Sequence, residues 1–105
     1  MERVYGRSNS RIAARVGDMF VLELEGNFTT GYLWRLSPDP AAKAAELRFV
    51  DEEMKPGGPA FGAAGRQRFR IEALSAGKHA LRAEYKRPWE TAPSEQLVFE
   101  IDVQR

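Results

Sequence analysis

Residues 78–86 read KHALRAEYK, and residues 97–103 read LVFEIDV. In both stretches the side chains alternate between an apolar or aromatic set and a mostly polar set, which is the period of a β-strand with two different faces. The inward positions are His79, Leu81, Ala83 and Tyr85 in the first stretch and Leu97, Phe99, Ile101 and Val103 in the second. These two stretches predict strands with one buried face.

The same period extends outward to most of the chain. Residues 20–25 and 68–73 alternate clearly, and weaker strand candidates lie at 11–15, 32–37 and 46–53. About seven short strands separated by turn-rich segments predict an all-β fold, a two-sheet antiparallel β-sandwich. Residues 40–46 could add a helical turn or two, too short to change this class.

Composition narrows the possible functions. The chain has 105 residues, 43% of them hydrophobic, which fits a single domain over 1–105. Sixteen basic and fifteen acidic side chains are interspersed and leave a net charge of +1, which argues against a nucleic-acid or membrane surface. The absence of cysteine excludes disulfides, thiol nucleophiles and cysteine-ligated metals. The near-neutral charge is compatible with a monomer.

The first residues of the chain bear on the cellular compartment of the protein. Residues 1–7, MERVYGR, contain no signal-like apolar stretch, and no apolar run approaches the roughly 20 residues of a membrane helix. We expect a cytoplasmic protein, or a secreted or periplasmic one if an export signal has been removed.

Three segments interrupt the strand pattern. Residues 26–31 read GNFTTG, residues 54–65 read MKPGGPAFGAAG, and residues 85–94 read YKRPWETAPS. Glycine, asparagine and threonine favour an ordered turn in the first segment. The second is long for a connection in a small domain, and the third places a tryptophan beside a strand-ending proline. Loops on a rigid sandwich are where such folds bind partners.

Catalytic and metal chemistry find little support. A serine triad would need His79 as its base, but no serine lies in a nucleophile-elbow motif, and the alternation predicts a histidine lining the core or a sheet edge. Asp51, Glu52 and Glu53 alternate faces on a strand, so they cannot converge on one ion and predict a solvated stretch. We therefore expect neither an enzyme nor a bound cofactor.

Two further patterns have ordinary explanations. The glycine-rich residues 57–65 lack the lysine and serine or threonine of a phosphate loop, and no helix pattern follows them. Arg66, Arg68 and Arg70 share one face of a strand, which we interpret as a solvated sheet face.

The interrupting segments carry three motifs in a defined order. Residues 27–32 read NFTTGY with Trp34 following, residues 62–65 read GAAG, and residues 87–89 read RPW. In order and spacing they resemble the NPTTG[YF]xW, GxGG and RP[WF] motifs of the chagasin family of cysteine-peptidase inhibitors. The resemblance covers nearly the whole chain, from about residue 11 to residue 103. Each motif alone is weak, but the three together on a cysteine-free β domain are specific.

The resemblance implies an immunoglobulin-like sandwich with three binding loops at one end, and a reversible, non-covalent inhibitor of papain-like cysteine peptidases, cathepsin L-like or related. By analogy, Thr29 and Thr30 enter the active-site cleft, the segment 62–65 lies on its non-primed side, and Trp89 with Arg87 contacts the primed side. The implied peptidase-binding residues are Asn27, Phe28, Thr29, Thr30, Gly31, Tyr32, Gly62, Ala63, Ala64, Gly65, Arg87, Pro88 and Trp89.

Two residues depart from the family motifs. Phe28 stands where the family has proline, so φ is not fixed there and we expect packing to hold the loop, with a possible apolar contact by Phe28 itself. Ala64 stands where the family has glycine, and its Cβ restricts the backbone.

Other interpretations of the same residues remain open. We expect Tyr32 and Trp34 to be core or loop-base residues and Trp89 to be an exposed contact. Thr29 and Thr30 could be simple turn formers. The alternative function is a non-inhibitory immunoglobulin-like adhesion or carbohydrate-binding domain, in which Trp89 and Tyr32 would stack on a sugar or partner.

Overall fold

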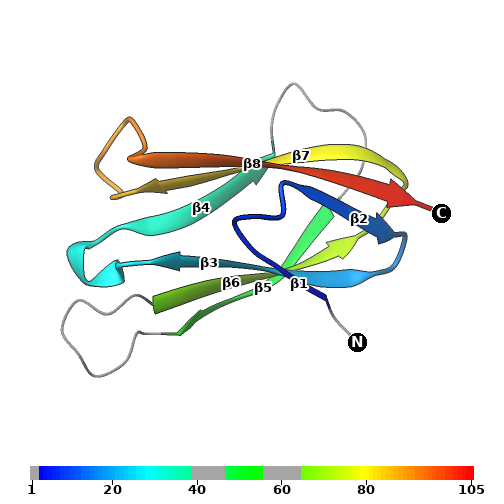
Figure 1. Ribbon diagram of the computed structural model, residues 1–105, viewed down its shortest axis with the longest axis horizontal. Helices are drawn as coiled ribbons and strands as arrows, with labels where there is room; N and C mark the ends of the chain where they lie inside the picture. Colours follow the sequence, from blue (N-terminus) through cyan, green and yellow to red (C-terminus); the bar gives the residue numbers. More distant parts are fainter. Residues whose placement is uncertain (1–2, 39–46, 56–64) are drawn as a thin grey trace.

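The structure, a computed structural model, describes residues 3–38, 47–55 and 65–105. Eight strands and one short 3-10 turn make up this part of the chain (Figure 1). They are β1 Arg3–Tyr5, β2 Arg11–Arg15, β3 Met19–Gly26, η1 Phe28–Thr30, β4 Leu33–Pro38, β5 Leu47–Lys55, β6 Gly65–Ala73, β7 Gly77–Lys86 and β8 Glu95–Gln104. The expected all-β class is confirmed. Within the described ranges, no helix is long and apolar enough to cross a membrane.

The strands form two four-stranded sheets, β1-β3-β6-β5 and β2-β8-β7-β4, stacked as two layers (Figure 1). If β1, β3, β4, β5, β6, β7 and β8 are lettered A to G, one sheet has the order A-B-E-D and the other C-F-G, with β2 added beside G. This is the immunoglobulin arrangement. The expected sandwich is therefore confirmed.

The N-terminal strands differ from the expectation of about seven antiparallel strands. β1 was not predicted, because its three residues are too few to show a period. β1 pairs with β3 in parallel, and β2 pairs with β8 in parallel. The chain leaves one sheet after β1 and joins the other at β2, so no hairpin forces the two directions to oppose each other.

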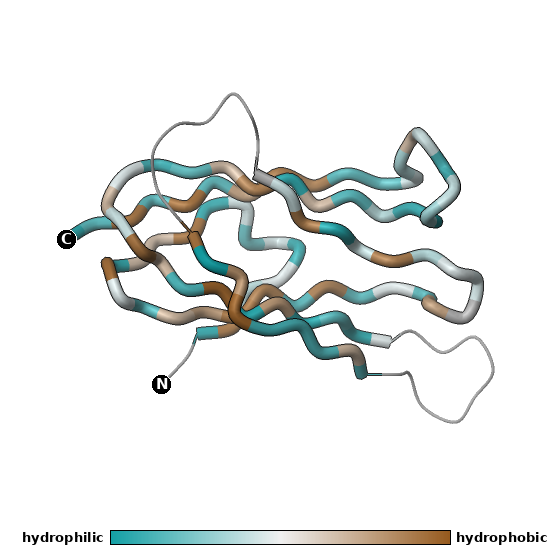
Figure 2. The backbone as a smooth tube through the Cα atoms, turned by 180° about the vertical axis from the view of Figure 1, so that it is seen from behind, coloured by the Kyte–Doolittle hydropathy of each residue, from teal (hydrophilic) through white to brown (hydrophobic). Residues whose placement is uncertain are grey.

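The core lies between the inward faces of the two sheets. Figure 2 shows hydrophobic and hydrophilic residues alternating along the strands. One buried cluster contains Ile12, Phe20, Leu22, Leu24, Trp34, Phe69, Ile71, Ala73, Leu81, Ala83, Phe99, Ile101 and Val103. His79 is half-buried opposite Ile101, as expected for an inward position. The burial of these side chains is the main stabilising term of the fold.

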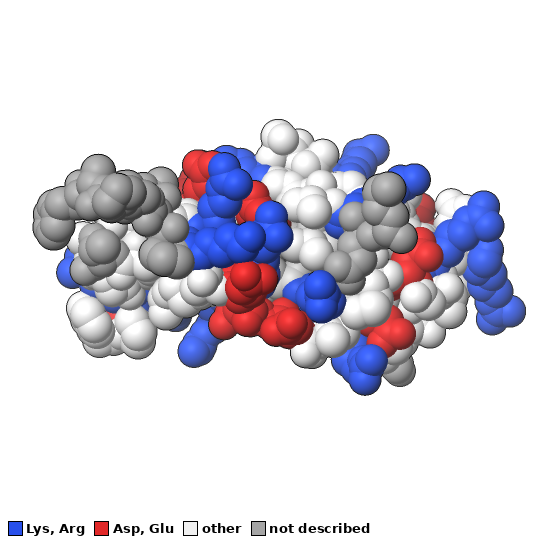
Figure 3. Space-filling model, turned by 90° about the horizontal axis from the view of Figure 1, so that it is seen from below, with Lys and Arg blue, Asp and Glu red and all other residues white. Residues whose placement is uncertain are grey.

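The outward face of β6 carries charge, as expected. Arg68 Nε lies 2.5 Å and Arg66 Nη1 3.7 Å from Glu23 carboxylate oxygens, and Arg70 Nη1 lies 3.7 Å from Asp51 Oδ2. Figure 3 shows basic and acidic side chains side by side on this face. The arginines are thus paired with carboxylates on a solvated sheet face.

The first connection, from β3 to β4, and the third, from β7 to β8, lie at one end of the sandwich, on the left in Figure 1. β5 ends and β6 begins at the same end, where the register pairs Gly26 with Gly65, and Leu33 with Lys86. β5 runs through Lys55 and β6 starts at Gly65, so both ends of the predicted long loop 54–65 belong to strands. Residues 56–64, with Gly62, Ala63 and Ala64, lie outside the described residues, as does the helical turn expected at 40–46.

Candidate functional site

The first connection is an ordered turn. Residues Phe28–Thr30 form one 3-10 turn, in which the Gly31 N–H donates to the Phe28 carbonyl at 3.2 Å. The Thr30 hydroxyl donates to the Asn27 carbonyl, also at 3.2 Å. Gly31 then adopts φ of 89°, a left-handed conformation that a side chain disfavours. The glycine at this position is therefore a backbone requirement.

Phe28 anchors this turn to the hydrophobic core. Its half-buried ring packs against the core cluster. A Cβ built on Gly26 would lie 2.8 Å from both Phe28 Cε1 and Tyr85 Cε1, and one on Gly65 would lie 3.0 Å from the Phe28 ring. The ring thus occupies space that two glycines leave free. Packing holds the loop where the related motif has proline, as the sequence predicts.

Tyr85 on β7 supports the turn from the facing sheet. Its hydroxyl accepts a hydrogen bond from the Asn27 N–H at 2.9 Å and lies 3.2 Å from the Asn27 carbonyl, to which it donates. Its ring stacks on Tyr32 with centroids 5.0 Å apart and contacts Trp34 at 4.9 Å. Trp34 is 3% exposed and Tyr32 is half-buried, so both are core or loop-base residues, as expected.

Arg87 connects the third connection to the first. Its guanidinium lies 4.6 Å above the Tyr32 ring and donates to the Tyr32 hydroxyl at 2.9 Å. This hydrogen bond is the main cause of a raised pKa of Arg87; desolvation opposes the rise, and electrostatic interactions with Tyr32 and Glu90 add to it. The Arg87 N–H donates to Glu90 Oε1 at 2.9 Å, and the Glu90 N–H donates to the Arg87 carbonyl at 3.0 Å, which closes the turn that carries Trp89.

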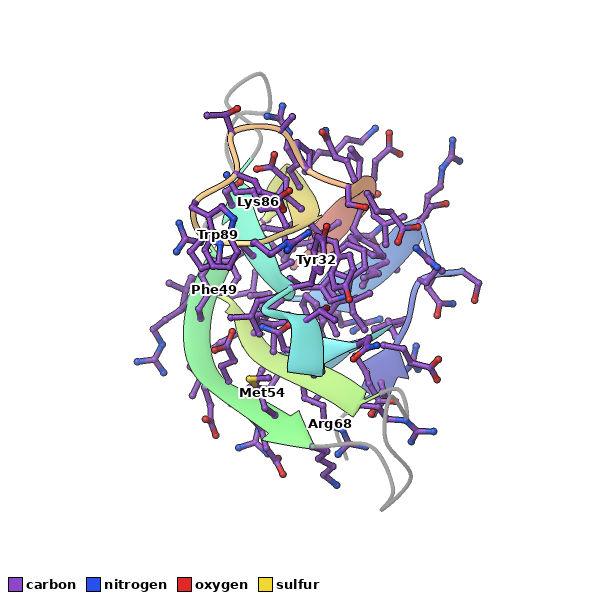
Figure 4. The ribbon with its side chains drawn as sticks, turned by 90° about the vertical axis from the view of Figure 1, so that its left-hand side faces the viewer. Tyr32, Phe49, Met54, Arg68, Lys86 and Trp89 are labelled. Carbon is purple, nitrogen blue, oxygen red and sulfur yellow. The ribbon has the colours of Figure 1, made fainter. Side chains whose placement is uncertain are left out.

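Trp89 is the most exposed of the large hydrophobic residues that the structure describes, at 71%. Its ring lies 5.6 Å from the Arg87 guanidinium, and a Cβ on Gly31 would lie 3.4 Å from Trp89 Cη2. The first and third connections are therefore in contact. Figure 4 looks onto this end, with Tyr32 and Trp89 labelled.

Ten of the thirteen predicted binding residues fall within the described ranges, and all ten lie at this end. Thr30, Pro88 and Trp89 are exposed; Asn27, Phe28, Gly31, Tyr32 and Arg87 are half-buried; Gly65 is buried; and only the backbone of Thr29 is described. Sequence reasoning did not assign the supporting roles of Tyr85 and Glu90. In the described ranges, no group of three or more histidine, aspartate or glutamate residues could hold a metal ion.

Two comparisons with known proteins bear on the family of this chain. Residues 13–103 match the family model described as Chagasin family peptidase inhibitor I42. Chagasin of Trypanosoma cruzi is 30% identical over 89 residues, which cover 83% of this chain and 80% of that protein. The chain belongs to the chagasin family of cysteine-peptidase inhibitors. The predicted family resemblance is confirmed.

Solved structures show the same fold. The cysteine protease inhibitor EhICP2 from Entamoeba histolytica superposes with a TM-score of 0.76 at 17% identity, covering 98% of this chain and 97% of that one. Amebosin gives 0.69 at 21% identity, with 99% of each chain covered. PbICP-C, solved in complex with falcipain-2, gives 0.66 at 22% identity, covering 97% and 99%. These proteins therefore share the sandwich fold of this chain.

Proposed function

We propose that this chagasin-family member, over 1–105 as one inhibitor domain, blocks the active-site cleft of papain-like cysteine peptidases with its loop end, reversibly and without a covalent step. The observation that carries the proposal is the exposed Trp89, beside the Arg87 guanidinium, next to the ordered turn Phe28–Thr30. Family membership supplies the class of target.

The turn can block a nucleophile without becoming a substrate. A 3-10 turn keeps the peptide bonds around Thr29 and Thr30 folded, whereas attack needs a peptide in a near-attack geometry. Phe28 and the Asn27–Tyr85 hydrogen bonds oppose its unfolding. The enzyme is therefore occluded by a turn that resists cleavage.

Trp89 and Arg87 supply the second contact. An exposed tryptophan already held over an arginine loses little conformational freedom when it docks, and both residue types are common anchors in protein interfaces. The segment 62–65 would add backbone pairing along the other side of the cleft, as in β-augmentation. The chain would act by occlusion alone, with no catalysis and no cofactor.

The carbohydrate-binding alternative is weaker at Tyr32. Its ring stacks on Tyr85 and lies under the Arg87 guanidinium, which leaves little of its faces for a sugar. Of the two proposed stacking residues, Trp89 alone is well exposed.

The test is titration of papain and of a cathepsin L-like enzyme with this protein, using a small fluorogenic substrate. We expect stoichiometric loss of activity that returns on dilution, with the inhibitor intact by mass spectrometry afterwards. Val98→Ala, at a 44% exposed site on β8, serves as a surface control that leaves inhibition unchanged. Full activity of both enzymes at micromolar inhibitor would contradict the proposal.

A further inference from the structure

Gln67 is the one buried polar side chain in the described ranges, at 2% exposure. It lies on β6, two residues after Gly65, opposite Met54, which Figure 4 labels. Its side-chain oxygen accepts a hydrogen bond from the Trp34 N–H at 2.9 Å. Its side-chain nitrogen donates to the Trp34 carbonyl at 2.9 Å and to Glu52 Oε1 at 3.1 Å.

These bonds close the open edge of β4. β4 pairs with β7 on one side and is the last strand of its sheet. Residues of an antiparallel strand alternate between bonding their neighbour and pointing away from it, and Trp34 points its N–H and carbonyl at Gln67. The Gln67 amide therefore takes the place of a missing neighbouring strand, and it reaches there from the facing sheet. It satisfies two backbone groups that burial would otherwise leave without partners.

The same bonds join the roots of the loops. Trp34 lies two residues after Tyr32, just beyond the turn. Its indole N–H donates to the carbonyl of Glu25, near the end of β3, at 2.9 Å. Glu52 lies near the end of β5, three residues before Lys55. One amide thus connects β6 to β4 and β5, and Trp34 continues the connection to β3.

We propose that Gln67 is a positioning residue for peptidase inhibition, which holds the Phe28–Thr30 turn and the strand ends Lys55 and Gly65 at a fixed separation across the two sheets. It does not contact the peptidase. This inference rests on the proposed function. According to this inference, part of the inhibitor's affinity for the peptidase depends on a residue that lies outside the three motifs.

The first test compares two core substitutions. Gln67→Met keeps the side chain's length and removes all three hydrogen bonds. Val103→Ala, 2% exposed and opposite Gly77 at the far end of the sandwich, lowers stability without touching the loops. Both are studied at a temperature where both are folded, by inhibition of papain and by hydrogen exchange of the Trp34 amide.

We expect Gln67→Met to weaken inhibition at least tenfold through faster dissociation and to lose protection of the Trp34 amide, while Val103→Ala stays within twofold of the unaltered chain. Equal inhibition by Gln67→Met and Val103→Ala would overturn the inference. Absence of inhibition by the unaltered chain would contradict the proposed function and this inference together, so the two failures are distinguishable.

A rescue experiment removes the ambiguity of a variant that folds poorly. Gln67→Glu keeps the acceptor for the Trp34 N–H, loses both donated bonds and sets a second carboxylate beside Glu52. Adding Glu52→Gln restores the hydrogen bond between the two side chains, with the amide donor now at position 52 and the carboxylate acceptor at position 67. We expect the double variant to recover at least threefold of the inhibition lost by Gln67→Glu. A double variant no better than Gln67→Glu would contradict the positioning role.

Discussion

The two described connections at the loop end are built in opposite ways. The turn Phe28–Thr30 is held from inside, by a half-buried phenylalanine and by the Tyr85 hydroxyl. The segment that carries Trp89 keeps its largest side chain 71% exposed and is held at its base by Arg87 and Glu90. The loop with the turn Phe28–Thr30 therefore contributes a fixed shape, and the loop with Trp89 contributes contact area. Substitutions in the first should alter stability and inhibition together, and substitutions in the second should alter inhibition alone.

Gly65→Ala should have the largest effect. Its Cβ would lie 2.8 Å from the Lys55 carbonyl oxygen and 3.0 Å from the Phe28 ring, and the first of these is backbone that cannot easily move. We expect a loss of about 3 kcal/mol in the free energy of unfolding, the upper range for overpacking, with inhibition weakened in parallel. Urea denaturation measures this loss in the free energy of unfolding. Gly6→Ala is the control, because its Cβ would meet the Glu23 carbonyl at an ordinary 3.5 Å; equal stabilities of the two variants would refute the argument.

Phe28→Ala tests the internal support directly. Removing the half-buried ring should cost about 2 kcal/mol of unfolding free energy, below the usual range for a fully buried phenylalanine, and should weaken inhibition as the turn loosens. Phe28→Pro restores a fixed φ without the ring. We therefore expect the proline variant to be as unstable as the alanine variant but to inhibit better. Inhibition by Phe28→Ala at the level of the unaltered chain would show that packing beneath the turn is unnecessary.

Trp89→Ala tests the other side of the comparison. The side chain is exposed, so its loss should change the unfolding free energy by less than about 0.5 kcal/mol. Affinity for a papain-like peptidase should fall by about 2 kcal/mol, or roughly 30-fold, as for an interface anchor. Thermal unfolding and inhibition titrations on the same preparation separate the two quantities. A large fall in stability would mean that Trp89 supports the fold instead.

The sequence predicts those features of the structure that depend on residues close together in the chain. Alternation along residues such as Leu81 and Phe99 predicts the sandwich, because a period of two is visible within a single strand. The resemblance of three motifs predicts the family and places Trp89 at the surface. β1 escapes prediction because it is three residues long.

Packing beneath the first loop was expected, but the partners that supply the support escape prediction for a different reason. Phe28 fills the space beside Gly65, and Gln67 bonds the backbone of Trp34, but each pair is distant in the sequence and meets only when the sheets stack. A signal for Gln67 does exist. It shares the inward parity of Phe69 and Ile71, and a polar residue at an inward position needs a partner.

Tyr32→Phe should have the smallest effect of the four substitutions. It removes the hydrogen bond from Arg87 to the Tyr32 hydroxyl, which ties the exposed loop to the base of the internal one. The ring remains stacked on Tyr85 and under Arg87, so the fold should be unchanged and inhibition should weaken by about two- to fivefold, the usual range for one solvent-accessible bond. The pKa of Arg87 is raised, so its stabilising contribution is complete at every pH below its ordinary value and is lost only as the pH rises through the higher folded pKa. The ratio of inhibition constants for Tyr32→Phe and the unaltered chain should therefore be constant between pH 5 and 8, and a ratio that changes across that window would show that another titrating group holds Trp89 in place.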